Sequence, residues 1–412
     1  MRNSRSAGDP GSCNDVGMMT ADDVRAELDA LLARRTAETR LTTMGAGSDD
    51  LDDGRAYLAA TVEGGWHVPH WPSVHGGRDA DPNEAGEIAT ALRDYLVPDL
   101  YPFAIGLGMV GPALLAHGTD EQKSQWLRPI AAGSEIWCQM FSEPEAGSDL
   151  ANVGLRAVRD GDEWVLTGQK TWTSRAMWAD WGICLARTDP EQPKHKGLTM
   201  FCVLMDQPGV DVRPLGQMNG DTHFSEVFVS EARIGDAWRV GDVGEGWRVA
   251  MTVLAHERAG GGSRGGGDGG SKKARTPNWI ADLRPTGALD RPVDRNAIVG
   301  VHVLDMIGRW TAQRAADAAR GGTPSPAGSG AKLRTVASYK GRAFTTNRAV
   351  GADGMLSDGH GYIETITAPS MSIRGGTDEI QRNILGERVL GLPGEPRLDR
   401  DVAWNESRRG LV

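Results

Sequence analysis

Cysteine is scarce in this sequence: there are four cysteines among 412 residues, and no two of them form a C-x-x-C pair. This usage argues against a disulfide-stapled scaffold and against a structural zinc site, and it fits a reducing cytoplasm. Basic charge is not in excess either, because 45 Lys and Arg residues stand against 55 Asp and Glu residues, which gives a formal net charge of −10. Nucleic-acid-binding proteins usually present a basic surface, so the composition disfavours that class.

The sequence also lacks an uninterrupted hydrophobic run of membrane-spanning length. Residues 100–119 contain no Asp, Glu, Lys or Arg, but Pro102, Pro112 and four glycines interrupt them. Because a transmembrane helix needs about 20 predominantly apolar residues, we expect a buried, broken helical segment here and no membrane span. The first residues, MRNSRSAGDPGSCND, lack the apolar core of a secretory signal.

Three regions of different texture follow one another along the chain. The first is mainly helical, with one helix expected to begin at the N-cap Thr20 and another at the capping box of Thr119 and Gln122. The second is rich in short β-forming runs, and the third is helical again. We expect a disordered tail over 1–19, a helical domain over 20–135, a β domain over 136–243, a helical bundle over 244–395 and a tail over 396–412.

Short strands separated by turns make up the middle region. Asp160-Gly161 is a strong hairpin signal, and Pro208-Gly209 and Asn219-Gly220 mark further turns. Strands at this spacing are typical of a small barrel or sandwich. The predicted strands are 137–141, 155–159, 163–167, 181–187, 199–205, 211–215 and 224–229.

Four helix-compatible segments make up the last region, and a bundle is the natural way for them to bury their apolar stripes. Two Gly-rich stretches, 260–275 and 320–330, are expected to be flexible loops. The predicted helices are 246–259, 293–320, 331–350 and 377–390.

Two motifs in the middle region could hold a planar cofactor. In FSEPEAGSD (141–149), a tight loop would expose hydroxyl and backbone N–H groups, which suits a dinucleotide; the alternative is an ordinary turn between strands. In GQKTWTS (168–174), expected to follow a turn at Gly168, Trp172 could cover a ring and Ser174 could bond a ring heteroatom. The alternative for Trp172 is a Trp-rich core.

Two further motifs lie in the helical region that follows. On a helical wheel of 244–260, Glu257 falls inside an apolar arc, where its pKa would be raised as a general base requires; the alternative is a structural ion pair. Gly375 and Gly376 precede Thr377, a predicted N-cap, so a ligand could approach the exposed N–H groups there, although plain capping explains the same pattern.

Taken together and in this order, the motifs resemble the acyl-CoA dehydrogenase family. The segments that carry the resemblance are WPSVHGG, HGTDEQKSQWLRPI, FSEPEAGSDLA, GQKTWTS, VGEGW, the HER triplet and GGTDEIQRNI. The resemblance, which spans about residues 20–395, implies an α+β fold with an N-terminal helical domain, a middle β-barrel and a C-terminal four-helix bundle. It also implies FAD and an acyl-CoA thioester, which is desaturated when a base removes the α-proton and the β-hydride passes to flavin N5.

The resemblance also assigns roles to individual residues. Trp172 and Ser174 match positions beside the isoalloxazine ring, Arg258 matches a substrate-side arginine, and a backbone N–H of Gly375 or Gly376 would polarise the thioester carbonyl. The remaining matches are Gln139, Phe141, Ser142 and Ser148 at the flavin and acyl-CoA site, and Thr377 and Glu379 at the adenosine-pyrophosphate part of FAD.

The sequence departs from the commonest family pattern at the catalytic base. Many members carry the base in a YEGT-like run, where this chain has Arg374-Gly375-Gly376-Thr377. Other branches place it on a bundle helix immediately before an arginine, and Glu257 matches that alternative. The predicted base is therefore Glu257, with Asp378 and Glu379 as the other candidates.

The resemblance also bears on assembly. The R-x-x-F-G and Q-x-x-G-G-x-G runs that bring FAD contacts across a dimer interface in many members are absent, although Gly351–Gly354 is a weak echo of the second. A homo-oligomer, a heteromeric pair with a related chain, and an electron-transferring flavoprotein as electron acceptor all fit the family. The alternatives are a flavin monooxygenase or oxidase with the same fold and a non-catalytic partner subunit.

Overall fold

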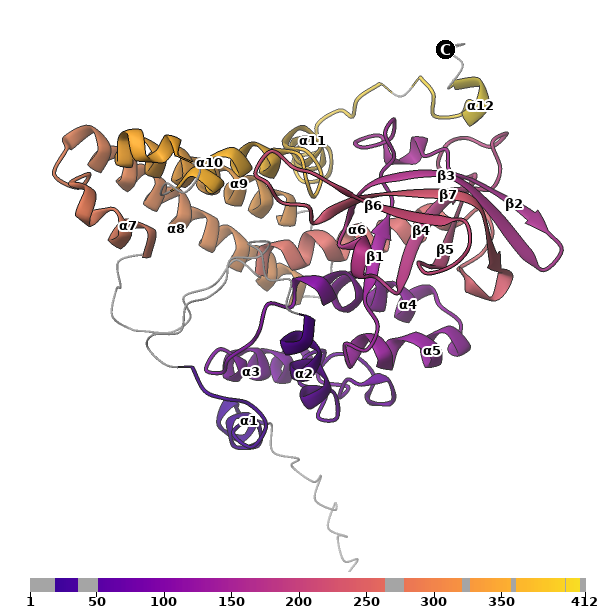
Figure 1. The fold of residues 1–412 in the computed structure, drawn as a ribbon, viewed down its shortest axis with the longest axis horizontal. Coiled ribbons are helices and arrows are strands. Elements are labelled where there is room, and N and C mark those ends of the chain that lie inside the picture. Colours follow the sequence, from indigo (N-terminus) through magenta and orange to yellow (C-terminus); the bar gives the residue numbers. More distant parts are fainter. Residues whose placement is uncertain are drawn as a thin grey trace, which may run out of the picture.

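The computed structural model describes residues 19–35, 51–263, 278–320, 327–356, 361–396 and 398–407, so the predicted disorder of 1–18 lies outside the described residues. Helices of the first region lie below a β-sheet, and a layer of long helices extends to one side (Figure 1). This helix–sheet–helix order confirms the predicted fold class. The helices of the first region are α1 (Ala21–Leu28), α2 (Leu51–Val62), α3 (Pro82–Leu92), α4 (Gly111–His117) and α5 (Asp120–Ala131).

Local sequence signals set the boundaries of these helices. Thr20 caps α1, and Thr119 caps α5 through a capping box, as predicted. Thr20 also forms a capping box, with Asp23, which was not predicted from the sequence. The uncharged segment 100–119 is broken as expected: a π-helical turn over Gly106–Val110 runs into α4. No helix within the described ranges is long and apolar enough to cross a membrane.

In the described segments, eight strands form one sheet in the order β6-β7-β3-β2-β4-β5-β8, with β1 pairing in parallel to β4. The hairpin at Asp160-Gly161 joins β2 to β3, as predicted. The strands are β1 (Trp137–Met140), β2 (Arg156–Asp160), β3 (Glu163–Ser174), β4 (Trp181–Arg187), β5 (Leu198–Leu204), β6 (Val210–Leu215), β7 (Phe224–Gly235) and β8 (Arg239–Val240).

The predicted turn at Gly168 is wrong, because β3 continues through this residue to Ser174. The strand pairing with β7 shifts register between Leu166 and Gly168, which marks a bulge. Gly168 has φ +154°, and a Cβ there would approach the Cα of Leu155 to 2.9 Å. Glycine therefore permits a close contact inside a continuous strand, and the same strand goes on to carry Trp172 and Ser174.

Seven helices follow the sheet in the described part of the chain, and four of them, α6, α8, α9 and α11, correspond to the predicted bundle. Two loop boundaries were wrong: α6 extends to Ser263, and α9 begins at Ala327, inside the predicted loop 320–330. Ser329 is buried, and a Cβ at Gly330 would lie 3.8 Å from Thr311 and 3.9 Å from Leu385, so packing overrides the Gly-rich composition there. The helices are α6 (Gly246–Ser263), α7 (Asn278–Asp282), α8 (Pro292–Arg320), α9 (Ala327–Val350), α10 (Tyr362–Thr367), α11 (Asp378–Arg388) and α12 (Trp404–Ser407).

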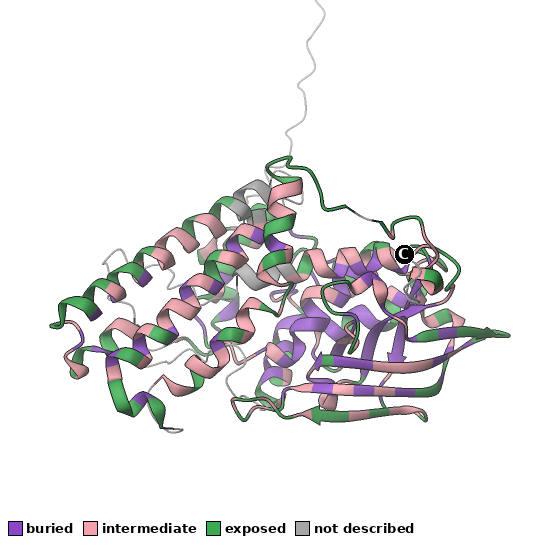
Figure 2. Ribbon diagram, turned by 90° about the horizontal axis from the view of Figure 1, so that it is seen from above, coloured by how far each residue is buried: buried purple, intermediate pink, exposed green. Residues whose placement is uncertain are grey.

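Tryptophan rings join the first helical region to the sheet. Trp126 of α5 packs edge-on against Trp137 and Trp181, and the rings of Trp137 and Trp181 are stacked 5.8 Å apart. Val249 and Val253 of α6 belong to the same buried cluster. Figure 2 shows the buried residues concentrated around the sheet and α6, whereas the long helices are mostly intermediate or exposed. The best-packed part of the molecule therefore carries α6 and the loop after β1.

Candidate active site

The loop that follows β1 folds tightly on itself. Glu143 N donates to Ala146 O, and Ala146 N donates to Glu143 O, both at 3.0 Å. Phe141 is buried at the start of the loop, whereas Ser148 is exposed near its end. A Cβ added at Gly147 would meet no heavy atom within 4 Å. The loop thus leaves room beside its backbone and hydroxyl groups, as a dinucleotide ligand would require.

A buried lysine ties this loop to β3. Lys170 is fully buried, and its Nζ donates to Phe141 O at 3.0 Å, Glu143 Oε1 at 2.8 Å and Leu185 O at 2.7 Å. The Glu143 carboxylate also accepts from the backbone N–H groups of Gly154, at 2.7 Å, and Leu155, at 2.8 Å. The pair is therefore a fully bonded hub at the base of the loop. The sequence analysis did not predict this pair, although a lysine inside a β-forming run could have indicated it.

Two other predicted residues lie beside this hub. Ser142 O accepts from Thr171 N at 2.9 Å, so the loop is also held to β3 by backbone. Gln139 lies half-buried on β1, where it pairs with Ile183 of β4. The structure thus brings the start of FSEPEAGSD and the centre of GQKTWTS together.

Trp172 is presented to solvent on β3 and does not belong to the core. It is 56% exposed, its φ is +57°, and a register shift separates Lys170 from Thr173 in the pairing with β7. Its ring contacts Phe224 edge-on at 5.7 Å. A large aromatic held outward in a left-handed conformation is unusual for a purely structural residue. Half-buried Ser174, paired with Phe224, follows on the same strand.

We expect Trp172→Ala to raise the FAD dissociation constant roughly tenfold, equivalent to about 1.4 kcal/mol, because a covering ring is lost. The melting temperature of the FAD-free protein should stay unchanged, since the ring is already exposed. Phe344→Ala on α9 is the matched control, because that ring is 47% exposed and far from the motif in sequence. Fluorescence titration with FAD measures both variants, and equal affinities would contradict a cofactor role for Trp172.

Glu257 lies on α6, one turn beyond the fully buried Val253. Its side chain is half-buried, and Oε1 lies 3.7 Å from the position of a Cβ on Gly375. The structure therefore brings the carboxyl group of the HER triplet to the glycine run that lies more than 100 residues later. Arg258 follows on α6, but its side chain lies outside the described part of the structure.

Backbone conformation at Gly375 and Gly376 leaves donors near this carboxyl group. The two residues have φ +67° and +80°, which glycine adopts without strain. Gly375 O accepts from Nε2 of the fully buried Gln381 at 2.8 Å. Within the described ranges, neither glycine N–H has a hydrogen-bond acceptor. A carboxylate and accessible backbone donors thus lie together, and Gln381, which sequence inspection missed, fixes the peptide.

The remaining residues of this run are engaged elsewhere. Thr377 caps α11 by accepting from Ile380 N at 3.2 Å. Asp378 pairs with Lys332 at 3.0 Å; burial would raise the pKa of Asp378, but hydrogen bonds from Lys332 and Ser372 lower it. Glu379 is exposed and pairs with Arg382 at 3.4 Å. Asp378 is committed to its ion pair with Lys332, and Glu379 is exposed to solvent, so both alternatives to Glu257 lose support.

Contacts between the sheet and the bundle join the two halves of the candidate site. Asn219 Nδ2 donates to Thr367 Oγ1 at 3.1 Å. Asn219 lies four residues before His223, which precedes Phe224, the pairing partner of Ser174. The bundle therefore contacts the loop that leads into β7, the strand paired with the end of β3.

Two histidines with lowered pKa predict a loss of stability in acid. Burial lowers the pKa of His117, whose Nε2 is 2.8 Å from Thr252 Oγ1, and that of His223 despite its hydrogen bond to Asp221. Below about pH 6.5 these histidines bind protons in the unfolded chain, but in the folded chain they stay neutral until the pH is lower. The free energy of unfolding should therefore fall as the pH decreases through and below that value. Urea titrations across this range measure the effect, which His117→Gln should reduce; a flat profile would contradict it.

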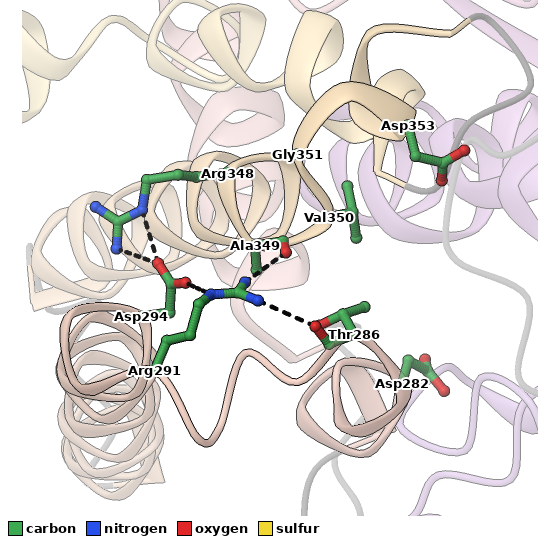
Figure 3. Close-up of a pocket in the computed structure, with 9 residues that line it drawn as sticks. All are labelled: Asp282, Thr286, Arg291, Asp294, Arg348, Ala349, Val350, Gly351 and Asp353. Carbon is green, nitrogen blue, oxygen red and sulfur yellow. Dashed lines mark hydrogen bonds and ion pairs between the residues drawn. The ribbon is translucent and has the colours of Figure 1, made fainter.

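A pocket of about 670 Å³ lies apart from this site, at the end of the bundle. Figure 3 shows Asp294 between Arg291 and Arg348, with distances of 2.5 Å and 3.0 Å. Arg291 also donates to Thr286 O and Ala349 O, so its guanidinium is committed to the fold. Asp353 of the Gly351–Gly354 echo lines this pocket together with Asp282 and Asp294. The pocket does not suit a diphosphate, because it has three carboxyl groups and its two arginines already bond within the protein.

No group of three His, Cys, Asp or Glu side chains in the described segments is arranged to hold a metal ion.

Family models match the chain in three consecutive segments. The acyl-CoA dehydrogenase N-terminal domain matches residues 19–134, the middle domain matches residues 138–231, and the C-terminal domain matches residues 244–390. Apart from Val243, the first residue of VGEGW, all the motifs that carry the family resemblance lie within these segments.

Individual proteins agree with this match. The chain is 33% identical to the acyl-CoA dehydrogenase IpdE1 of Mycobacterium tuberculosis over 396 residues, covering 92% of this chain and 100% of IpdE1. It is 37% identical to the acyl-CoA dehydrogenase FadE34 of the same organism over 81% of this chain, but the match spans only 46% of FadE34. Among solved structures, the Tcur3481-Tcur3483 steroid ACAD matches with a TM-score of 0.71 and 27% identity, covering 91% of this chain and 97% of that one. The chain belongs to the acyl-CoA dehydrogenase family and is an FAD-dependent oxidoreductase.

Proposed function

We propose that this protein desaturates an acyl-CoA thioester between Cα and Cβ, with Glu257 as the base. One observation carries the proposal: Glu257 Oε1 lies 3.7 Å from the Cβ position of Gly375, where two glycine N–H groups have no acceptor among the described residues. Removal of an α-proton needs a base on one side and stabilisation of the developing enolate oxygen on the other. The arrangement supplies both kinds of group.

In the proposed reaction, the Glu257 carboxylate accepts the α-proton and becomes a carboxylic acid. The N–H of Gly375 or Gly376 donates to the thioester oxygen as negative charge develops there. Bound FAD would supply the acceptor for the hydride from Cβ, which takes up the two electrons that the substrate loses as its C=C bond forms. Gln381 holds the Gly375 carbonyl and thereby keeps the peptide oriented.

The residues of this chain fit FAD. We assign the ribityl and ring contacts to the loop after β1, through Gln139, Phe141, Ser142 and Ser148, and to Trp172 and Ser174 of β3. Thr377 and Glu379 would contact the adenosine-pyrophosphate part, and Ser148 and Arg258 the substrate. The outward Trp172 and the open space beside Gly147 support this assignment.

We further propose a bulky, steroid-derived acyl group as substrate. The support is the similarity of this chain to the Tcur3481-Tcur3483 steroid ACAD, at 27% identity. The test is anaerobic addition of CoA thioesters to the FAD-loaded protein, with steroid side-chain and straight-chain acyl-CoAs compared. Bleaching of the flavin by the steroid thioester alone is expected. Bleaching by neither class would contradict the desaturase proposal, and preference for straight chains would contradict the substrate class.

A partner chain, either a second copy or a related subunit, is proposed to cover α8. Its exposed face carries Val299, Val303 and Trp310, which are 53%, 49% and 61% exposed. Apolar residues at this spacing form one helix face, and such a face is typical of an interface. An electron-transferring flavoprotein as electron acceptor and a cytoplasmic location stay predictions.

An oxidase or monooxygenase reaction is the alternative with the same fold, and a non-catalytic subunit is another. The partly buried Glu257 beside the glycine run disfavours the non-catalytic subunit, which needs no base at that place. An oxidase would need the same base and differs in passing the electrons of the reduced flavin to oxygen. Rapid production of hydrogen peroxide on reaction of the reduced protein with oxygen would favour the oxidase.

A further inference from the structure

The segment 398–407, called the tail segment here, returns from the bundle to the sheet. Figure 1 shows an extended stretch leading from α11 to α12, which lies beside the sheet. Trp404 N donates to Gln192 O at 2.9 Å and Asn405 N donates to Pro190 O at 3.0 Å. The indole Nε1 of Trp404 donates to Asn152 Oδ1 at 2.9 Å. The tail segment is therefore docked by specific bonds on the loop 188–196 and on the residues that follow FSEPEAGSD.

Under the Trp404 ring lies a buried arginine that holds the same loop from inside. The Arg187 guanidinium is 4.8 Å from the ring centroid, and Arg187 is only 2% exposed. It donates to Ala151 O at 2.6 Å and to Val153 O at 3.1 Å. Burial lowers the pKa of Arg187 to about 10. A guanidinium this buried depends on its carbonyl partners and on the aromatic face above it.

A second link joins the tail segment to the end of the FSEPEAGSD motif. Lys194 Nζ lies 3.0 Å from Asp149 Oδ2 and 2.5 Å from Asp399 Oδ2. Asp149 is the residue after Ser148, which we assign to FAD and the substrate. The tail segment therefore has two independent connections to this part of the chain. Trp404 and Arg187 reach the residues just after FSEPEAGSD, and Asp399 and Lys194 reach its last residue.

We propose that Trp404 is a positioning residue and that the tail segment is a strap which holds the loop 141–153 in its FAD-binding conformation. The proposal rests on the assignment of FAD to this loop. The loop is held at two places. Lys170 and Glu143 hold its first residues, whereas Arg187 and the tail segment hold the second end, after Ser148. Loss of the strap removes the support that Trp404 and Asp399 give to this second end, where Arg187 and Lys194 remain. FAD affinity should then fall although the core is intact.

The test compares a chain ending at Glu395 with a control chain ending at Ser407, which keeps every described tail residue. FAD binding is measured by fluorescence, and the FAD-free melting temperature is measured in parallel. We expect the shorter chain to bind FAD at least tenfold more weakly, with little change in the melting temperature. A synthetic peptide of residues 396–407 added in excess should restore part of the affinity.

Point variants keep the test decisive if the shortened chain does not fold. Trp404→Ala should weaken FAD binding, whereas Trp404→Phe, which keeps a ring over Arg187, should recover most of it. Equal FAD affinity of wild type and Trp404→Ala would overturn the strap. If Trp172→Ala also leaves the affinity unchanged, the FAD location itself is wrong; if Trp172→Ala weakens binding and Trp404→Ala does not, only the strap is wrong.

Discussion

Glu257→Gln should lower the rate of flavin reduction by acyl-CoA about 10³-fold while leaving FAD bound. A positioned general base contributes roughly 10²–10⁴-fold to a proton transfer, and an amide cannot accept the α-proton. The change keeps the size of the side chain, so packing beside Val253 and Gly375 should be preserved. Stopped-flow recording of the flavin absorbance without oxygen measures the rate. The visible flavin spectrum before mixing shows whether the cofactor remains bound.

Glu245→Gln is the matched control, because this carboxyl group lies immediately before the same helix, is 53% exposed and pairs only loosely with Arg248 at 3.5 Å. Its rate should equal that of the wild type. Glu257→Asp should fall between the two, since it keeps a carboxylate but withdraws it from Gly375. Undiminished bleaching by Glu257→Gln would remove this residue from the mechanism, as would a rate that stays flat while the pH falls through the acid range.

Local signals predicted most of the fold. The N-cap at Thr20, the capping box at Thr119 and the hairpin at Asp160-Gly161 depend on residues within a few positions of one another, and all three are present. The errors arose where distant contacts decide. Gly168 continues a strand because Leu155 approaches its backbone, and α9 begins at Ala327 because Ser329 and Gly330 pack on neighbouring helices.

The candidate site divides in the same way. Side-chain chemistry and the family resemblance predicted Glu257, Trp172 and the glycine run. They could not predict the fixed supports: Glu143 and Lys170 are separated by 27 positions, and Asn152 and Trp404 by 252. The residues around each of these side chains do not indicate which distant residue it will contact. The structure therefore adds mainly the residues that hold the site in place.

The second large effect is expected for the buried ion pair of Lys170 and Glu143, which holds the loop after β1. Lys170→Met should destabilise the protein by about 3–5 kcal/mol, because the Glu143 carboxylate, whose side chain is only 10% exposed, would lose its cation. The loop after β1 would also lose the bond from Nζ to Phe141 O, so FAD binding should weaken markedly. Urea unfolding of the FAD-free protein measures the first effect, and FAD titration measures the second.

A double variant separates the buried charge from the lost packing. Lys170→Met with Glu143→Gln should be less destabilised than Lys170→Met alone, since the uncompensated charge is then absent and the amide oxygen can still accept from Gly154 or Leu155. Arg233→Met is the control: it breaks an ion pair with Glu163 at 2.7 Å, but both side chains are about half-exposed, so the unfolding curve should barely move. If Lys170→Met unfolds like Arg233→Met and binds FAD normally, the loop is not held by this pair, and its conformation must depend on backbone contacts such as that between Ser142 and Thr171.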